Sequence, residues 1–275
     1  MNQKARVAIA EDTLKLLEQE YYVNTTGARV DLQQAMEHAT AHTTLYTPEA
    51  LQTMLDQRPD VGGSFTTTYE VTNETTLDAV RRLAAAGAGN ILCLNFASAK
   101  NAGGGFLGGA IAQEECIARA SGLYPCLLKA PAYYAFHRKQ WSCLYSDHMI
   151  YSPAVPILKD ELGVLLDEIV LTAIVTSPAV NAGVVVEREK ENKEQIIPVM
   201  RVRTAKLLAL CATHGHDTLV LGAWGCGVFR NNPEEIAALF HEALTGPFAG
   251  QFRKVVFAVK TNKDSIIEPF MKYFL

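Results

Sequence analysis

From Thr66 to the C-terminus, short apolar runs alternate with longer segments in which apolar residues recur at helical spacing. The apolar runs have the length and composition of buried strands, whereas the longer segments have the pattern of amphipathic helices. The expected strands are residues 66–73, 90–98, 147–158, 168–180, 217–224 and 253–260, and the expected helices are residues 74–87, 110–127, 196–215, 231–244 and 265–274. This alternation predicts an α/β fold with a largely parallel sheet and helices on both faces.

The N-terminal part of the chain lacks this regular alternation of strands and helices. Its expected elements are a helix over 4–20, a hairpin over 21–32 that turns at Gly27, and short helices over 32–42 and 48–57. The stretch RPDVGGS at 58–64 has the composition of a boundary. We therefore expect an N-terminal, mainly helical accessory segment over 1–65 and a second domain over 66–275.

The first of two glycine-rich loops leads directly into a pair of acids. Residues 103–115 read GGGFLGGAIAQEE, with five glycines in the first seven positions. Glycine tolerates positive φ and close approach of another group, so the block suggests backbone folded tightly around a ligand. Two adjacent acids raise the proton affinity of one of them, which suits a general acid. Glu114 and Glu115 could alternatively be first-turn acids that only complement a helix dipole.

The second loop, GAWGCGVFRNNPEE at 222–235, follows the apolar run TLVL. It ends at a well-specified helix start, with Asn232 as the expected N-cap and Pro233 in the first position. Successive glycine N–H groups beside a helix N-terminus can bind a diphosphate, although a plain strand-to-helix turn has the same appearance. Neither G-K-[ST] nor G-x-G-x-x-G is present, which argues against a Walker loop and a dinucleotide fingerprint. Both loops follow strands, at the edge of the sheet where ligands usually bind.

Composition and charge narrow the class of protein. The chain has 275 residues and a net charge of −4, so no overall basic field would attract DNA or RNA. It has no apolar run of about 18 residues and no signal-peptide pattern, so we expect no membrane partner. The cysteines are scattered without a C-x-x-C pair, a pattern typical of reduced thiols in a cytoplasmic protein without a zinc site. They are Cys93, Cys116, Cys126, Cys143, Cys211 and Cys226.

Three other stretches carry side chains with catalytic or binding potential. The motif His214-Gly215-His216 could bind a metal, but a helix end followed by glycine explains it better. The pair Asp147-His148 lacks a G-x-S-x-G partner, which argues against a hydrolase triad. The basic, aromatic stretch YYAFHRKQW at 133–141 fits a packed amphipathic segment, or else a surface that stacks an adenine or touches a polymer.

The motif NAGGGFLGGAIAQEE at 101–115 resembles the GGG-x(6–8)-QEE signature of the poly(ADP-ribose) glycohydrolases, with seven residues between Gly105 and Gln113. The segments SPAVNAG at 177–183 and GAWGCGVFRNNP at 222–233 also resemble the short, microbial branch of that family. The resemblance implies a macrodomain-like, three-layer α/β/α fold with a mixed, largely parallel central sheet and an N-terminal helical extension.

The resemblance also implies roles for individual residues. Glu115 would be the general acid that protonates the leaving 2′-oxygen of a ribose–ribose bond and then activates water, and Glu114 would hydrogen-bond the ribose hydroxyls. An acid at the leaving oxygen and negative charge near an oxocarbenium-like centre suit glycoside cleavage in general. The implied ligand-binding residues are Asn101, Gly103, Gly104, Gly105, Gln113, Gly225, Cys226, Gly227, Val228 and Phe229, with Asn181 as a weaker assignment.

The leading hypothesis is therefore an enzyme that releases ADP-ribose from poly(ADP-ribose), in the exo direction that the short branch implies, without a metal or cofactor. Its expected partners are poly(ADP-ribose) or ADP-ribosylated proteins as substrate and ADP-ribose as product, with no direct DNA, RNA or membrane partner. One alternative is a macrodomain that binds ADP-ribose without turnover, which would need the phosphate loop but not the acid pair. Another is a hydrolase of mono-ADP-ribosylated side chains or of O-acetyl-ADP-ribose.

Overall fold

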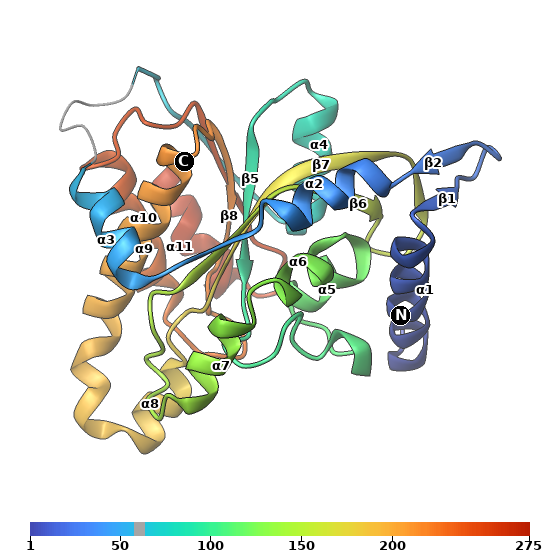
Figure 1. Ribbon diagram of the computed structural model, residues 1–275. Coiled ribbons are helices and arrows are strands. Elements are labelled where there is room, and N and C mark those ends of the chain that lie inside the picture. The colour runs from blue at the N-terminus through green and yellow to red at the C-terminus, as the bar shows by residue number, and fades with distance from the viewer. Residues whose placement is uncertain (58–63) are drawn as a thin grey trace.

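A seven-stranded mixed sheet forms the centre of the protein in the computed structural model, which describes residues 1–57 and 64–275 (Figure 1). Across the sheet the strands are β3 (Thr44–Tyr46), β6 (Met149–Lys159), β7 (Leu165–Ser177), β5 (Ile91–Phe96), β8 (Thr218–Leu221), β9 (Lys254–Ala258) and β4 (Thr68–Thr72). The five strands from β7 to β4 run parallel, whereas β3 and β6 pair antiparallel. The predicted, largely parallel sheet is confirmed.

Helices cover both faces of the sheet, as the alternation of strands and helices predicted (Figure 1). One face packs against α3 (Pro48–Asp56), α9 (Ile196–Thr213), α10 (Pro233–Thr245) and α11 (Asp264–Phe274). The other packs against α2 (Gln33–Ala41), α4 (Thr76–Ala85), α5 (Gln113–Ala120) and α6 (Leu123–Leu128). Strand β8 is buried at all four positions, because both of its faces are covered.

The predicted single helix over 110–127 is wrong. The chain first makes a short 3₁₀ turn, η1 (Phe106–Gly108), and α5 begins only at Gln113. Helix α5 then ends at Ala120, because Ser121 is extended and bridges to Ile157 of β6. The N–H of Gly122 donates to the Pro156 carbonyl (2.8 Å), and α6 begins after it. Contacts with a strand distant in sequence therefore divide a segment whose local pattern is helical.

The N-terminal segment contributes a helix, a hairpin and one edge of the sheet. It contains α1 (Gln3–Gln19) and the hairpin of β1 (Tyr21–Val23) and β2 (Arg29–Asp31), followed by α2, β3 and α3. Ala10 of α1 packs with Phe106 and Ala118 against the first glycine loop and α5. The expected boundary at residues 58–64 lies, except for Ser64, outside the described residues. Within the described ranges, no helix combines the length and apolarity that crossing a membrane requires.

Two helices that the strand pattern did not predict lie at the same end of the molecule as the carboxyl end of β5 (Figure 1). Helix α7 (Pro131–Lys139) contains most of the basic, aromatic stretch, and α8 (Ala182–Arg188) follows β7. The short η2 (Lys190–Gln195) joins α8 to α9. These additions surround the edge of the sheet at which both glycine-rich loops emerge.

Candidate active site

A cavity of about 750 Å³ opens at the carboxyl edge of the sheet, where loops from all five parallel strands meet. It is lined by residues 74–76 after β4, 96–101 after β5, Ala179 after β7, Ala223 and 225–229 after β8, 258–261 at the end of β9, and 111–117 at the start of α5, together with Tyr145, Glu161 and Ile266. The two glycine-rich loops leave from β5 and β8, which are neighbours in the sheet. Ligands of parallel sheets bind at this edge.

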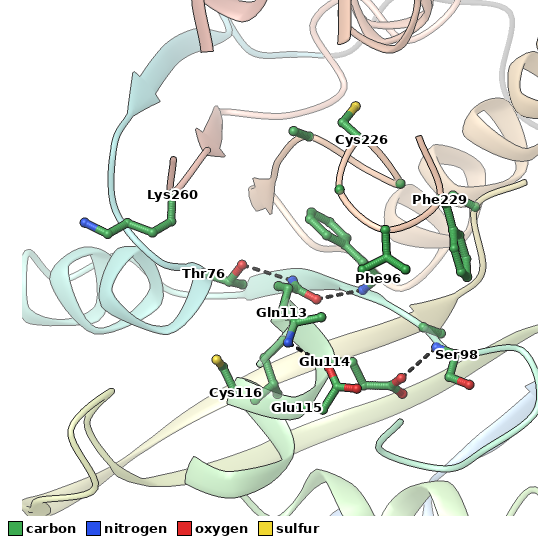
Figure 2. Close-up of a pocket in the computed structure, with 18 of the residues that line it drawn as sticks. Thr76, Phe96, Ser98, Gln113, Glu114, Glu115, Cys116, Cys226, Phe229 and Lys260 are labelled. Carbon is green, nitrogen blue, oxygen red and sulfur yellow. Dashed lines mark hydrogen bonds between the residues drawn. The ribbon is translucent and has the colours of Figure 1, made fainter. Parts of the chain in front are cut away.

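Gln113 fixes the start of α5 at this edge. Its Oε1 accepts a hydrogen bond from the N–H of Phe96 (2.8 Å), and its Nε2 donates to the Leu94 carbonyl (2.7 Å) and to Thr76 Oγ1 (3.0 Å). Figure 2 shows these bonds to Phe96 and Thr76. Because all three partners belong to the protein, the amide positions the two acids that follow it.

Glu114 is almost fully buried, with 2% of its surface exposed. Burial raises its pKa to about 8, and the nearby charge of Glu115 adds to the rise. The Ser98 N–H (2.6 Å) and Asn95 Nδ2 (3.2 Å) donate to its two oxygens and oppose this shift without cancelling it. The raised proton affinity expected for one member of the pair therefore falls on Glu114, and its main cause is burial.

Glu115 is more accessible than Glu114, with 9% of its surface exposed. Its Oε1 accepts from the N–H of Gly105 (2.9 Å) and its Oε2 accepts from the N–H of Ala112, the N-cap residue of α5 (3.1 Å). The second bond is half of a capping box, so Glu115 also stabilises the start of its own helix. Each oxygen keeps a lone pair that can face a ligand in the cavity.

The first glycine loop is pressed against the acid pair. Gly103 and Gly104 have φ values of +68° and +59°, a region that side-chain-bearing residues rarely adopt. A Cβ at Gly104 would collide with the Glu115 carboxylate and lie 3.2 Å from Glu114 Oε2. A Cβ at Gly103 would lie 2.8 Å from the ring of Phe106. The close approach that the glycines permit is thus to the protein's own acids and to the side chain beneath the loop.

The second glycine loop presents backbone donors to the cavity. The Cys226 N–H is used within the loop, where it donates to the Ala223 carbonyl (3.1 Å). The N–H groups of Gly227, Val228 and Phe229 have no hydrogen-bond partner in the described ranges, and all three residues line the cavity. Consecutive N–H groups without a protein partner are available to bind a phosphate.

The sequence predicts that the loop and the N-terminus of α10 bind an anion together, and in the structure the first residues of this helix lie outside the lining of the cavity. The Asn232 side chain caps the helix by accepting from the Glu234 N–H (2.9 Å). Neither residue lines the cavity. The predicted cap is confirmed, but the helix N-terminus is occupied by its own side chain.

Aromatic and thiol side chains complete the walls around the acids. Figure 2 shows Phe96 and Phe229 on the same side of the cavity as the second loop, opposite the glutamates. Tyr145, which has a φ of +56°, lies with its ring centroid 6.0 Å from that of Phe229. Burial raises the pKa of Cys226 to about 12, so its thiol stays neutral beside the free N–H groups and would not repel an anion.

Comparisons with known proteins agree with this arrangement. Residues 10–160 match the family model of the microbial-type PARG, catalytic domain. PARG is poly(ADP-ribose) glycohydrolase, and the match spans more than half of the chain. The chain belongs to the microbial-type PARG family. A comparison with curated proteins gave no match.

Solved PARG structures resemble the chain over almost its whole length. The structure of poly(ADP-ribose) glycohydrolase from Thermomonospora curvata is 46% identical, with a TM-score of 0.94 over 98% of this chain and 100% of that one. The same protein bound to the inhibitor ADP-HPD has a TM-score of 0.91 at 46% identity, again over 98% and 100% of the two chains. The enzyme from Deinococcus radiodurans, in complex with ADP-ribose, is 46% identical with a TM-score of 0.83 over 86% of this chain and 96% of that one. The fold of this chain is therefore macrodomain-like, as the resemblance implied.

Most residues that the PARG signature implied lie together at the cavity. Those that line it are Asn101, Gln113, Glu114, Glu115, Gly225, Cys226, Gly227, Val228 and Phe229. Gly103, Gly104 and Gly105 lie behind the acids and do not line it. Asn181 is also outside the lining, where it caps α8 by accepting from the Val184 N–H (3.3 Å).

Several residues in or next to the cavity were not predicted from the sequence. Ser98, in the lining, and Asn95, behind it, donate to Glu114. Lys260 follows β9, and Thr76 is the first residue of α4 (Figure 2). Asn95 left a detectable signal, because it is a polar residue inside the otherwise apolar run ILCLNF. The others follow strands, and only the order of the strands in the sheet shows that they meet.

The other polar residues that the sequence singled out form interactions away from the cavity. His214 and His216 hydrogen-bond through Nε2 to the hydroxyls of Tyr46 and Tyr151 (both 2.9 Å). Asp147 forms ion pairs with Arg203 (2.9 Å) and Lys206 (2.8 Å). Within the described residues, no three His, Cys, Asp or Glu side chains gather at metal-binding distance.

Proposed function

We propose that the protein hydrolyses the ribose–ribose O-glycosidic bonds of poly(ADP-ribose) from the chain terminus and releases ADP-ribose, with Glu115 as general acid and base. The observation that best supports this proposal is the buried acid pair in the cavity. The opposite wall of the cavity contains three residues whose backbone N–H groups have no hydrogen-bond partner in the described ranges. A terminal ADP-ribose would place its diphosphate against those groups and its distal ribose against the acids. We also propose a cytoplasmic location, which the six free thiols support.

Bond cleavage in this proposal needs one proton and one water. The C1–O2′ bond breaks, its electron pair goes to the 2′-oxygen, and Glu115 donates a proton to that oxygen. The ionised Glu115 then accepts a proton from a water that attacks the oxocarbenium-like carbon. In this proposal Glu115 enters the first step protonated and leaves it ionised, and the proton taken from the attacking water returns it to its starting state. Glu115 faces the substrate because it is the more exposed member of the pair.

The acid pair also separates this proposal from an ADP-ribose reader. A reader needs the free N–H groups of the second loop, but burying two carboxyls beside a polyanionic ligand would only weaken its binding. Burial of Glu114 raises its pKa, and this desolvation of a carboxyl group destabilises the folded state. Such a group at a cavity favours a catalytic role over simple binding.

The test is the variant Glu115→Gln. We expect turnover of poly(ADP-ribose) to fall by about 10² to 10⁴, because the amide is close to isosteric but cannot donate the proton. ADP-ribose affinity should be retained. Glu235→Gln is the matched control, because Glu235 occupies the same third helical position in α10 and faces solvent.

Three results would contradict the assignment. Near wild-type turnover in Glu115→Gln would assign the acid to another residue. Equally small losses of turnover in Glu115→Gln and Glu235→Gln would show that the acid pair only complements a helix dipole. Oligomers rather than single ADP-ribose units among the first products would contradict cleavage from the terminus.

A further inference from the structure

The segment that carries the first glycine loop and α7 contains few acidic residues. Between Ala79 and Ser146 the only acidic residues are Glu114 and Glu115, although the chain has 29 acids in 275 residues. Both are buried, so this segment presents almost no carboxylate to solvent. The other acids of the chain lie outside this segment, among them Glu74 and Glu161 in the cavity lining and the exposed Glu187, Glu191 and Glu194 of α8 and η2.

Helix α7 and the residues after it carry exposed cations and aromatic rings within this segment. Trp141 is 71% exposed and Phe136 is 47% exposed. Arg138 and Lys139 lie beside them on the surface, and neither pairs with a carboxylate in the described part of the chain. We call these four residues the α7 ridge.

Burial in the core does not account for the α7 ridge. The buried face of α7 consists of Tyr133, Tyr134 and His137, which are 0%, 4% and 0% exposed. The amphipathic interpretation of the sequence explains those three residues. The ridge residues lie outside that buried face, and Trp141 follows the end of the helix, where its exposed ring contributes nothing to the core.

Hydrogen bonds connect the α7 ridge to the acid pair. Arg138 Nη1 donates to the carbonyl of Lys100 (2.9 Å), and Lys100 lines the cavity. Two residues earlier in the same loop, the N–H of Ser98 donates to Glu114 Oε2. The Phe136 ring is held against His148, with centroids 4.6 Å apart. The ridge therefore begins beside the loop that holds Glu114.

The proposed reaction determines what must lie near this loop. The terminal unit occupies the cavity, and the leaving 2′-oxygen belongs to the adenosine of the next unit, so the rest of the polymer leaves the cavity beside the acids. Each further unit carries two phosphates and an adenine. Cations match the phosphates, and exposed aromatic rings stack on bases without reading their sequence.

Resting on the proposed function, we propose that the α7 ridge binds the units of poly(ADP-ribose) that lie beyond the bond being cleaved. Arg138 and Lys139 contact the diphosphate, and Trp141 or Phe136 stacks on the adenine. The ridge is thus a second substrate-binding surface, distinct from the cavity that takes the terminal ADP-ribose.

Binding measurements in the Glu115→Gln background test this surface without turnover. Affinity is measured for long poly(ADP-ribose) and for free ADP-ribose, at several salt concentrations. The ridge is altered by Trp141→Ala and by the double variant Arg138→Gln/Lys139→Gln. The control double variant Lys15→Gln/Arg29→Gln makes the same charge change at exposed positions on α1 and β2.

We expect Trp141→Ala to weaken polymer binding about fivefold or more, because stacking on one base contributes at least that factor. The Arg138→Gln/Lys139→Gln variant should reduce the slope of log affinity against log salt by about 1.4. Affinity for ADP-ribose should stay within about twofold in Trp141→Ala and in the control variant. In Arg138→Gln/Lys139→Gln it should fall by less than polymer affinity, because Arg138 also donates to the Lys100 carbonyl.

If the ridge variants bind polymer no more weakly than the control variant does, the proposal is wrong. Parallel losses of polymer and ADP-ribose affinity would also overturn it, since they would show a disturbed cavity rather than a second surface. Failure of the proposed function has a different signature: the wild-type protein would release no ADP-ribose from polymer, whatever the binding data.

Discussion

The raised pKa of Glu114 makes the stability of the protein depend on pH in a direction that can be measured. Burial raises this pKa from 4.5 to about 8, so between these values the folded state holds a proton that the unfolded state has lost. Stability due to this proton is fully present below the unfolded pKa and is lost as pH rises through the folded pKa. Glu114→Gln removes the titrating group and keeps the size of the side chain.

The slope follows from the linkage relation. Within the window the wild-type free energy of unfolding should fall by about 1.4 kcal/mol per pH unit relative to the variant. From about pH 5.5 to about pH 7.5 the difference amounts to about 3 kcal/mol. The introduced amide can still accept from the Ser98 N–H, and its NH₂ can donate to Asn95 Oδ1 after an amide flip, since that oxygen has no partner in the described structure.

Urea unfolding of both proteins at several pH values provides the measurement. The difference between them isolates Glu114, because other groups that titrate on folding, such as His137 with its pKa lowered to about 4 by burial, are common to both. Glu70→Gln is the control: ion pairs with Lys254 and Arg82 lower the pKa of Glu70, so its variant should differ from wild type by a constant in this window. A constant difference for Glu114→Gln as well, or a slope of opposite sign, would refute the assignment of the proton.

Three further predictions concern ligand binding and turnover. ADP-ribose at about a hundredfold excess over Kd should raise the free energy of unfolding by about 2.7 kcal/mol in a thermal or urea assay, and no shift would contradict both the enzyme and the reader. Turnover should survive EDTA, because leaving-group protonation needs only an acid; activity restored by a divalent ion would contradict this. Arg6→Met should lower kcat about tenfold with little change in ADP-ribose affinity, because Arg6 Nε donates to the Gly109 carbonyl (2.6 Å) and braces the glycine loop; Lys4→Met, exposed on the same helix, is the control.

Features of the fold that depend on neighbouring residues were predictable from the sequence. The Asn232 cap and Pro233 define the start of α10 through local geometry. The apolar run TLVL became the fully buried β8, because its lack of polar residues leaves no solvent-facing side. The break between α5 and α6 was not predictable, since it depends on Ser121 bridging to a strand that comes later in the chain.

The same distinction, between interactions of neighbouring residues and contacts made only in the folded chain, applies to the site. Specific residue types in a fixed order, such as the glycine block and the two acids, are enough to indicate a ligand site at this edge of the sheet. Which of the two acids holds a raised pKa could not be predicted, because it depends on how deeply each side chain is buried. Nor could the sequence predict that Ser98 and Lys100 connect Glu114 to α7, since those bonds join segments that only the folded chain brings together.

The glycine block illustrates how a correct inference from sequence can have a different physical origin from the one expected. Absent side chains predicted a close approach to the backbone, and the structure has one at each of three glycines. At Gly104 the neighbour is the acid pair, at Gly103 it is Phe106, and at Gly109 it is the backbone of Gln3 in α1, 2.7 Å from where a Cβ would lie. The Gly105 N–H, between these contacts, is the donor that orients Glu115. The glycines are therefore needed first to hold Glu115, the proposed general acid, in position, so that the loop orients this side chain before a ligand binds.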